Sequence, residues 1–357
     1  GPPFATGMPH YGHLITGGLK DVVTRYWTQR GFHVDRRFGW DCHGLPIECI
    51  INKKLEINTK KDLNAIGIEK YNSECRKVIM TYADDWKYYT ERFGRWIDFE
   101  NDYRTMYPSF MESVWWVFKQ IYDKGKVYRK CKVMPFSPAC NTVLSNFEAG
   151  ENYQNVSDPS IVITLPLISD NNIKLLAWTT TPWTLPSNLF LAVNPKMKYV
   201  HIKCNGDDEQ QYILAETRLV EVLKQIKVDS GKYEIIKHYM GTELAGFEYK
   251  PLFTDFYEKY KPRGCFKVYC ADYVTDEDGT GIVHNAPGFG EDDYNVGVKY
   301  NLVDPDSPLC PMDDDGCFTA EFPMTKGIYF KTADPIIIDH LKKEKRLLFH
   351  GTINHKY

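Results

Sequence analysis

No two of the ten cysteines form a CxxC pair, and no apolar run approaches the roughly 20 residues that a membrane-spanning helix needs. Thiols scattered along a chain of 357 residues do not indicate a disulfide framework. No secretory or transit segment opens the sequence, and residue 1 already lies in GPPFATG, which is typical of the end of a strand. We therefore expect a soluble, cytoplasmic protein without a membrane segment, from which an upstream piece is missing.

Internal repeats, low-complexity tracts and a strong excess of one charge are missing as well. The net charge is −3, yet residues 1–150 hold 22 Lys+Arg against 17 Asp+Glu (+5), and the remainder holds 22 against 30 (−8). A mildly basic first part is compatible with a polyanionic partner. It is too weakly basic to predict nucleic-acid binding by itself.

The length of the chain predicts two globular domains. In residues 1–150, apolar residues at helical spacing predict helices from His10 to Gly31, along 63–89, and from Pro108 to Gly125. The run FHVDRRFGW reads as a strand, so this part is expected to form a parallel α/β sheet. We interpret Trp115, Trp116 and Phe118 of the third helix as core residues, since aromatics at helical spacing usually pack.

Beyond residue 150 the sequence changes to short β-rich runs separated by Asn, Asp, Gly and Pro: IVITLPLI, KLLAWTT, LFLAV, KYVHIK and QYILAE. These runs predict a second, strand-rich domain. One helix is expected from Ala333 to Glu344, and the final GTINHKY shows no clear element.

The string PHYGH lies where a strand is expected to give way to a helix, so the amides of the helix start are available to an anion. Gly7 and Gly12 allow close approach of main chain to a phosphate, and His10 and His13 could donate hydrogen bonds as charge develops on it. The alternative is that both histidines are ordinary capping or core residues.

A second chemical signal joins two distant strings, WTTTPWTLPSN and GTGIVHNAPGFGEDDY. In the first, three threonine hydroxyls precede Pro182, where the chain must turn; in the second, a strand delivers His284 into a Gly- and Pro-rich loop that ends at Asp292 and Asp293. The alternatives are a plain β-strand end for the threonines and a metal or solvated cluster for the two aspartates.

Several strings together resemble one family. GPPFATGMPHYGH followed by GWDCHGLPIE resembles the first signature of class I aminoacyl-tRNA synthetases in its isoleucine form, and GRWIDFENDYRTMYPSFMESVWWVFKQIYDKGKVYR is similar to eukaryotic cytosolic isoleucyl-tRNA synthetases. The threonine and His284 strings resemble the editing domain of the isoleucine, valine and leucine enzymes. The resemblance implies a partial Rossmann-like parallel sheet with helices in 1–150, a β-rich α/β editing domain in 151–350, and the start of a return to the catalytic domain in 351–357.

The resemblance also implies roles for single residues. In the synthetic site, ATP would bind Gly7, His10, Gly12 and His13, while Pro2 would line the isoleucine pocket and Asp41 would bind the α-ammonium. Asp41 could alternatively be a capping or surface carboxylate. In the editing site, Asp293 would hold the α-ammonium of the wrong amino acid, the terminal adenosine and ester would contact Thr179, Thr180 and Thr181, and the side-chain pocket would be shaped by Trp183, His284 and Phe289. The implied catalytic residues are His10, His13, Thr180, Thr181, His284 and Asp293.

The function so implied is an isoleucine–tRNA ligase that uses ATP with Mg²⁺, isoleucine and tRNA(Ile), and that hydrolyses valyl-tRNA(Ile). No nucleophile is recognisable beside a base, so we expect an ordered water, positioned by the threonine hydroxyls and His284, to attack the ester.

The sequence also departs from the family pattern. The lysine-rich KMSKS signature does not occur, so we expect editing but not efficient adenylate formation from this chain. Where bacterial relatives carry a zinc-binding CxxC pair, PFSPAC has Ser137 and only Cys140, so we expect no zinc. Two alternatives stay open: a fragment that binds nucleotide or tRNA acceptor ends without turnover, and a valine- or leucine-specific relative. The sequence does not address larger assemblies.

Overall fold

The computed structural model describes residues 1–151, 153–205, 210–229 and 231–356, and it divides into two compact units, 1–129 and 130–357. Residues just after 129 bond to the second unit: the Cys131 thiol lies 2.9 Å from the Asp306 carbonyl, and the Asn141 amide donates to the Asp315 carboxylate at 2.9 Å. The expected domain limits at 150/151 and 350/351 stay predictions. Tyr357, in the last of the expected segments, lies outside the described residues.

The first unit combines helices with a two-stranded parallel sheet, as the α/β prediction requires. The predicted helix after His10 is α1 (Tyr11–Gln29), and the predicted strand is β1 (Arg37–Trp40), which pairs in parallel with β2 (Asp98–Arg104). The strand end expected in GPPFATG is wrong, since residues 1–10 contain no regular strand. Pro2 and Pro3 carry no N–H to donate to a ladder, and the Pro3 carbonyl accepts the amide of Asp41, the residue after β1, at 2.9 Å.

The remaining helices of this unit are α2 (Leu45–Leu55), α3 (Lys60–Ile66), α4 (Ile68–Val78), α5 (Ala83–Arg92) and α6 (Pro108–Asp123). The single helix predicted along 63–89 is wrong, because it is broken into α3, α4 and α5. Gly67, with a φ of +86°, ends α3 and precedes α4 in a backbone conformation that other residues rarely adopt. The predicted helix from Pro108 is confirmed as α6.

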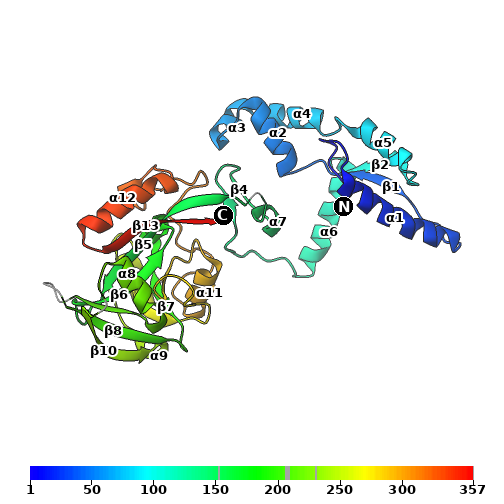
Figure 1. The fold of residues 1–357 in the computed structure, drawn as a ribbon. Coiled ribbons are helices and arrows are strands. Elements are labelled where there is room, and N and C mark those ends of the chain that lie inside the picture. Colours follow the sequence, from blue (N-terminus) through cyan, green and yellow to red (C-terminus); the bar gives the residue numbers. More distant parts are fainter. Residues whose placement is uncertain (152, 206–209, 230, 357) are drawn as a thin grey trace. The chain divides into compact units, whose positions relative to one another are not determined.

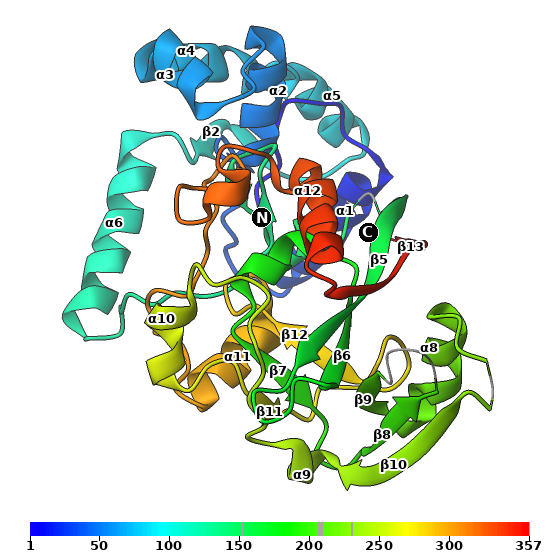
Figure 2. The ribbon, with the colours of Figure 1, turned by 90° about the vertical axis from the view of Figure 1, so that its left-hand side faces the viewer.

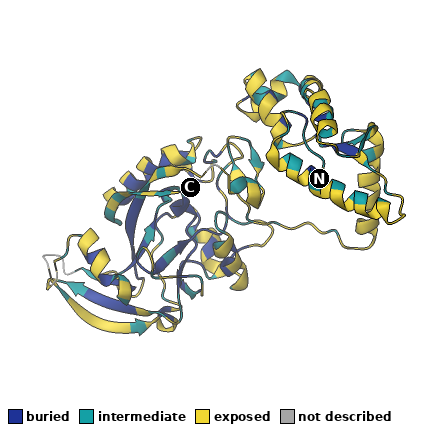
Figure 3. Cartoon of the chain, turned by 45° about the vertical axis from the view of Figure 1, so that its right-hand side comes forward, coloured by how far each residue is buried: buried dark blue, intermediate teal, exposed yellow. Residues whose placement is uncertain are grey.

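The core of the first unit is small. Its buried residues gather beside β1 and α2, around Phe38, Trp40, Ile47 and Trp86. The core role predicted for the α6 aromatics is wrong for this structure: Trp115, Trp116 and Phe118 are 71%, 63% and 56% exposed. Figure 3 shows this contrast, with mostly exposed helices in the first unit and buried strands in the second.

The second unit is built on a nine-stranded sheet, which confirms the strand-rich prediction (Figures 1 and 2). Its main path runs β10-β8-β9-β6-β12-β7-β11, and β5 pairs with both β6 and β13. The strands are β5 (Asn155–Pro166), β6 (Ile173–Thr179), β7 (Phe190–Val193), β8 (Lys198–Cys204), β9 (Gln211–Ala215), β10 (Tyr233–Met240), β11 (Val268–Cys270), β12 (Ile282–Asn285) and β13 (Leu347–Lys356). The absence of an element predicted for GTINHKY is wrong, because β13 pairs along β5 from Leu347–Ile163 to Lys356–Asn155.

Short helices surround this sheet. The α-helices are α8 (Leu219–Gln225), α9 (Gly241–Leu244), α10 (Tyr257–Tyr260), α11 (Glu291–Lys299) and α12 (Phe330–Lys343), and the 3₁₀ helices are η1 (Pro182–Ser187), η2 (Glu216–Arg218), η3 (Lys261–Arg263) and η4 (Pro323–Thr325). Before β5 lie β3 (Phe136–Ser137), β4 (Thr142–Val143) and α7 (Asn146–Ala149). The predicted late helix is α12, which begins three residues before Ala333. Within the described parts of the chain, no helix combines the length and apolar character that crossing a membrane requires.

Candidate functional site

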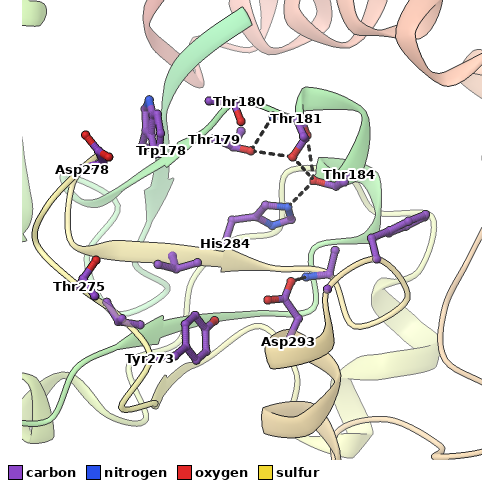
Figure 4. A pocket seen from close by; sticks show the side chains of 15 residues that line it. Trp178, Thr179, Thr180, Thr181, Thr184, Tyr273, Thr275, Asp278, His284 and Asp293 are labelled. Carbon is purple, nitrogen blue, oxygen red and sulfur yellow. Dashed lines mark hydrogen bonds between the residues drawn. The ribbon is translucent and has the colours of Figure 1, made fainter. Parts of the chain in front are cut away.

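Strand pairing brings the two distant strings of the second unit together. Strand β12, which carries His284, lies between β6 and β7, with Val283 opposite Trp178 and His284 opposite Leu191. Strand β6 ends at Thr179, and the chain turns through Thr180 and Thr181 into η1, as Pro182 predicted. The threonine string and the His284 loop therefore face each other (Figure 4).

These two strings line a cavity of about 340 Å³, within the size range of small-molecule sites. Its walls are Trp178, Thr179, Thr180, Thr181, Thr184, Tyr273, Val274, Thr275, Asp278, Val283, His284, Ala286, Phe289, Gly290 and Asp293. All residues predicted for this site line the cavity except Trp183. The Trp183 ring lies behind the wall, packed edge-on against Phe289 with 5.2 Å between ring centroids.

The threonine hydroxyls form a connected group at one side of the cavity. The Thr181 hydroxyl lies 3.2 Å from that of Thr179 and 3.4 Å from that of Thr184. The Thr181 amide donates to the Thr179 hydroxyl at 3.1 Å, and the Thr184 hydroxyl donates to the Thr181 carbonyl at 2.8 Å. Since a hydroxyl both donates and accepts, this group can bind a polar ligand atom or a water.

His284 is buried, and both of its ring nitrogens are occupied. The Asn188 amide nitrogen lies 2.9 Å from Nδ1, and because an amide NH₂ only donates, Nδ1 carries no proton. The proton is therefore on Nε2, which donates to the Thr184 hydroxyl at 2.8 Å. The Tyr249 hydroxyl fixes the amide by donating to the Asn188 oxygen at 2.7 Å.

This environment keeps the imidazole neutral. Burial lowers the pKa of His284 to about 3, because the charged ring would be desolvated. With a protonated Nε2 and an occupied Nδ1, the ring has no free lone pair with which to accept a proton from water. The Nε2–H of His284 contacts the Thr184 hydroxyl at the cavity wall, and the expected part of His284 in positioning a water stays a prediction.

Asp293 faces the same cavity from the first turn of α11. One carboxylate oxygen accepts the Ala286 amide at 2.7 Å, and burial raises the pKa of the carboxyl to about 6. A Cβ at Gly290 would come within 2.8 Å of this carboxyl, so a side chain there would displace it. Asp292, in contrast, is exposed. Of these two adjacent aspartates, Asp293 therefore faces the cavity and Asp292 lies on the surface. A carboxylate beside hydroxyls suits a ligand that carries an ammonium group.

Several functional candidates were missed by sequence reasoning. Thr184 and Asn188 lie in the string WTTTPWTLPSN, three and seven residues after Thr181. The turn predicted within this string was therefore a signal that both residues lie close to the threonine hydroxyls. Tyr273, whose hydroxyl donates to Asn285 at 2.7 Å, lines the cavity from a loop that carried no signal. Tyr249, which contacts Asn188 and not the cavity, carried no signal either, since it is fully buried and distant in sequence.

The first unit holds the other candidate site, at the start of α1. His10 caps this helix, with its Nδ1 accepting the Gly12 amide at 3.1 Å, and the Nδ1 of His13 accepts the His10 amide at 3.2 Å. Both Nδ1 atoms are therefore unprotonated in the neutral rings, and each Nε2 carries a proton. The structure thus shows the helix capping that was the alternative interpretation of these histidines. This capping leaves the Nε2–H groups of His10 and His13 available as donors.

The other residues predicted for this site lie near β1. The Asp41 amide donates to the carbonyl of Pro3, the residue after Pro2, and the Gly7 carbonyl accepts the Trp86 ring N–H at 2.8 Å. In the second unit, the Cys140 amide donates to the Ser137 hydroxyl at 3.2 Å. Over the described ranges, no three His, Cys, Asp or Glu side chains group as metal ligands do, and the expectation about zinc stays a prediction.

Comparisons with known proteins agree with the resemblance. The family model described as tRNA synthetases class I (I, L, M and V) matches residues 1–352. The chain is 55% identical over 358 aligned positions to a Mus musculus protein named isoleucine–tRNA ligase, cytoplasmic, covering 100% of this chain and 28% of that protein. It is 53% identical to the protein of that name from Schizosaccharomyces pombe, covering 100% and 33%. The chain thus spans about a third or less of the length of these relatives.

Among solved structures, the crystal structure of the P. knowlesi cytosolic leucyl-tRNA synthetase editing domain matches with a TM-score of 0.41 and 13% identity. That match covers 56% of this chain and 98% of the other chain.

Proposed function

The chain belongs to the class I tRNA synthetases for isoleucine, leucine, methionine and valine, and from that premise we propose that it is part of a cytoplasmic isoleucine–tRNA ligase. In this proposal the second unit hydrolyses valyl-tRNA(Ile), and the first unit carries ATP-binding residues of the synthetic site. The names of the mouse and fission-yeast relatives support the isoleucine assignment and the cytoplasmic location.

The need for a hydrolytic site follows from the substrates. Isoleucine exceeds valine by one methylene, and isoleucine–tRNA ligases are themselves the known example, preferring isoleucine by only about 150-fold at the synthetic site. A second pocket that admits valine and excludes isoleucine removes the products of this error. The observation that carries the proposal is the placement of Asp293 and the threonine hydroxyls around one cavity.

In the proposed complex, Asp293 binds the α-ammonium of the valyl group, which the carboxylate can do once it is ionised. Thr179, Thr180 and Thr181 contact the terminal adenosine and the ester. Phe289 shapes the side-chain pocket with His284, and Trp183 supports Phe289 from behind. Ammonium binding further favours the ionised carboxylate, because an opposite charge lowers the pKa that burial raises.

The hydrolysis needs a water and no covalent intermediate. The water oxygen attacks the ester carbonyl, the bond to the ribose oxygen then breaks, and valine and tRNA with a free hydroxyl leave. His284 cannot serve as the base for a hydroxyl nucleophile, because both of its ring nitrogens are engaged. An aminoacyl ester is reactive, so positioning of the water by the threonine hydroxyls supplies the main assistance.

In the synthetic site, we propose that the Nε2–H groups of His10 and His13 donate to ATP phosphates, with Gly7 and Gly12 allowing close approach. ATP would arrive with Mg²⁺, which screens phosphate charge. Asp41 would bind the α-ammonium of isoleucine, and Pro2 would line that pocket. tRNA(Ile) is the proposed macromolecular partner of both units, and no zinc is expected in this chain.

The direct test is deacylation of purified valyl-tRNA(Ile) and isoleucyl-tRNA(Ile) by this chain. We expect the valyl ester to be hydrolysed at least about tenfold faster, since the added methylene of isoleucine would not fit. Preference for the isoleucyl ester would contradict the proposed substrate. Binding of both esters without turnover would instead support a chain that only holds acceptor ends.

A further inference from the structure

The loop between β11 and β12, residues 271–281, forms one wall of the cavity. Four of its side chains line the cavity: Tyr273, Val274, Thr275 and Asp278. Asp278 is exposed, and the hydrolysis proposed above gives it no role. In Figure 4 it lies near Trp178, on the other side of the cavity from Asp293. The cavity therefore holds a second carboxylate, apart from the one that would bind the ammonium.

Arg218, the last residue of η2, holds the end of the loop that carries Asp278. Its Nε donates to the Gly279 carbonyl at 3.0 Å, and its Nη1 donates to the Glu277 carbonyl at 3.0 Å. These two carbonyls belong to the residues on either side of Asp278, so one guanidinium fixes the main chain before and after it. The Arg218 side chain is only 14% exposed, and it also forms an ion pair with Glu221 on α8.

The loop also packs closely where Arg218 holds it. A Cβ at Gly279, whose φ is +69°, would lie 2.8 Å from the Trp178 ring. The other end of the loop is held separately, because the Asn194 side-chain amide donates to the Val274 carbonyl at 2.8 Å. Loss of the Arg218 contacts should therefore move the Asp278 end of the loop and leave the Val274 end in place.

We propose that Arg218 is a positioning residue of the editing site: it fixes the main chain around Asp278 so that this carboxylate accepts a hydrogen bond from the terminal adenosine of the tRNA. The inference rests on the proposed hydrolysis and deepens it with a further contact to that adenosine. A carboxylate only accepts hydrogen bonds, and the ribose hydroxyls and the adenine amino group can donate them. An arginine suits the positioning role, because its planar fork of donors reaches two carbonyls in one fixed geometry.

Removal of the guanidinium should weaken substrate binding more than it slows the chemical step. In Arg218→Ala, we expect KM for valyl-tRNA deacylation to rise about tenfold with kcat within about twofold, because the lost contact serves the bound substrate and the transition state equally. Arg218→Lys keeps the charge but not the fork, so its KM should rise only about threefold. A wild-type KM in Arg218→Lys would overturn the proposal, since the charge alone would then suffice. Arg263→Ala, at an exposed arginine of η3, is the matched control and should leave KM unchanged.

A double-mutant cycle tests whether Arg218 acts through Asp278. Asp278→Ala alone should raise KM about tenfold with little change in kcat. In that background Arg218→Ala should raise KM by no more than about twofold further, because the carboxylate that it positions is absent. A combined rise of about 100-fold would show independent effects and would overturn the proposal.

A measurement without substrate separates this inference from the proposed function. The Trp178 ring N–H donates to the Ser160 hydroxyl at 2.9 Å, and the ring lies against Gly279, so its indole ¹⁵N–H resonance reports the position of the loop. In the 357-residue chain, this resonance should move in Arg218→Ala and stay in Arg263→Ala. An unmoved resonance in Arg218→Ala would contradict the positioning of the loop by Arg218, whatever the chain hydrolyses. A moved resonance in a chain without deacylase activity would support that positioning and contradict the proposed hydrolysis.

Discussion

The two units present their candidate sites in opposite ways. In the first unit, His10 and Gly12 are exposed at the start of α1, and the available groups are ring N–H donors. In the second, His284 is buried in a cavity wall, and burial changes the pKa values of both His284 and Asp293. The comparison teaches that a helix start needs little enclosure to present donors, whereas the protonation of groups in the second unit's cavity depends on the surrounding walls.

The largest effect should come from removing the carboxylate of the second unit. Asp293→Ala is expected to lower kcat/KM for valyl-tRNA deacylation by at least about 300-fold, because a partly buried ammonium would lose its counter-charge. Deacylation assays should show no such loss for Asp292→Ala, the exposed neighbour. Equal losses in the two variants would show that the cavity does not define the site.

A substitution in the candidate site of the first unit should affect ATP–pyrophosphate exchange and not deacylation. In the intact synthetase that the proposal implies, His13→Ala should lower isoleucine-dependent ATP–pyrophosphate exchange about 100-fold, as expected for the loss of one donor to a developing charge. Valyl-tRNA deacylation should not change. His33→Ala, at an exposed histidine of the same unit, provides the control. If His13→Ala also impaired deacylation, the two sites would not be independent.

A pH series sharpens the contrast. The pKa of Asp293 is raised to about 6 in the free protein, so the ionised form that binds an ammonium increases as pH rises through this value. We expect kcat/KM for deacylation, corrected for spontaneous hydrolysis, to rise about tenfold between about pH 5 and pH 7. His284, with a pKa of about 3, should add no step in this range. The low residual activity of Asp293→Asn should be independent of pH there; a persisting rise would assign the titration to another group.

The smallest effect concerns the stability of the second unit. Burial raises the pKa of Asp334 from 3.8 to about 7, so the folded protein holds this proton more tightly than the unfolded chain. The carboxyl therefore lowers the free energy of unfolding progressively as pH rises from about 4 to about 7. Asp334→Asn should raise that free energy by about 2 kcal/mol more at pH 8 than at pH 5. Urea unfolding of both proteins at the two pH values measures the difference.

Much of the fold was predictable from local patterns. Helices α1 and α6 and strands β5 to β9 follow from apolar spacing, because each period matches one backbone geometry. Gly67 is a sequence signal for the end of a helix. Apolar residues at helical spacing continue on both sides of it, however, and they led to the prediction of a single helix. Strand β13 was missed because its partner β5 lies about 200 residues earlier, as the pair Lys356–Asn155 shows. Polar residues of β13, such as His350 and Thr352, pair with β5 through main-chain hydrogen bonds. The local sequence pattern does not indicate such bonds.

The candidate sites show the same division. Motif chemistry indicated the threonine string, His284 and Asp293, and in the structure these residues line one cavity, while their roles stay predictions. The sequence could not show that the His284 ring nitrogens are both engaged, since Asn188 and Tyr249 reach the ring through contacts formed only on folding.

By itself, the sequence determined which chemical groups are present and which local elements carry them. Tertiary structure decided what each group can do. Asp292 and Asp293 are chemically identical neighbours, yet successive residues of a helix point about 100° apart, so one meets solvent and the other the cavity. Burial raises the pKa of Asp293 to about 6, and this desolvation depends on the surrounding walls and not on the residue type.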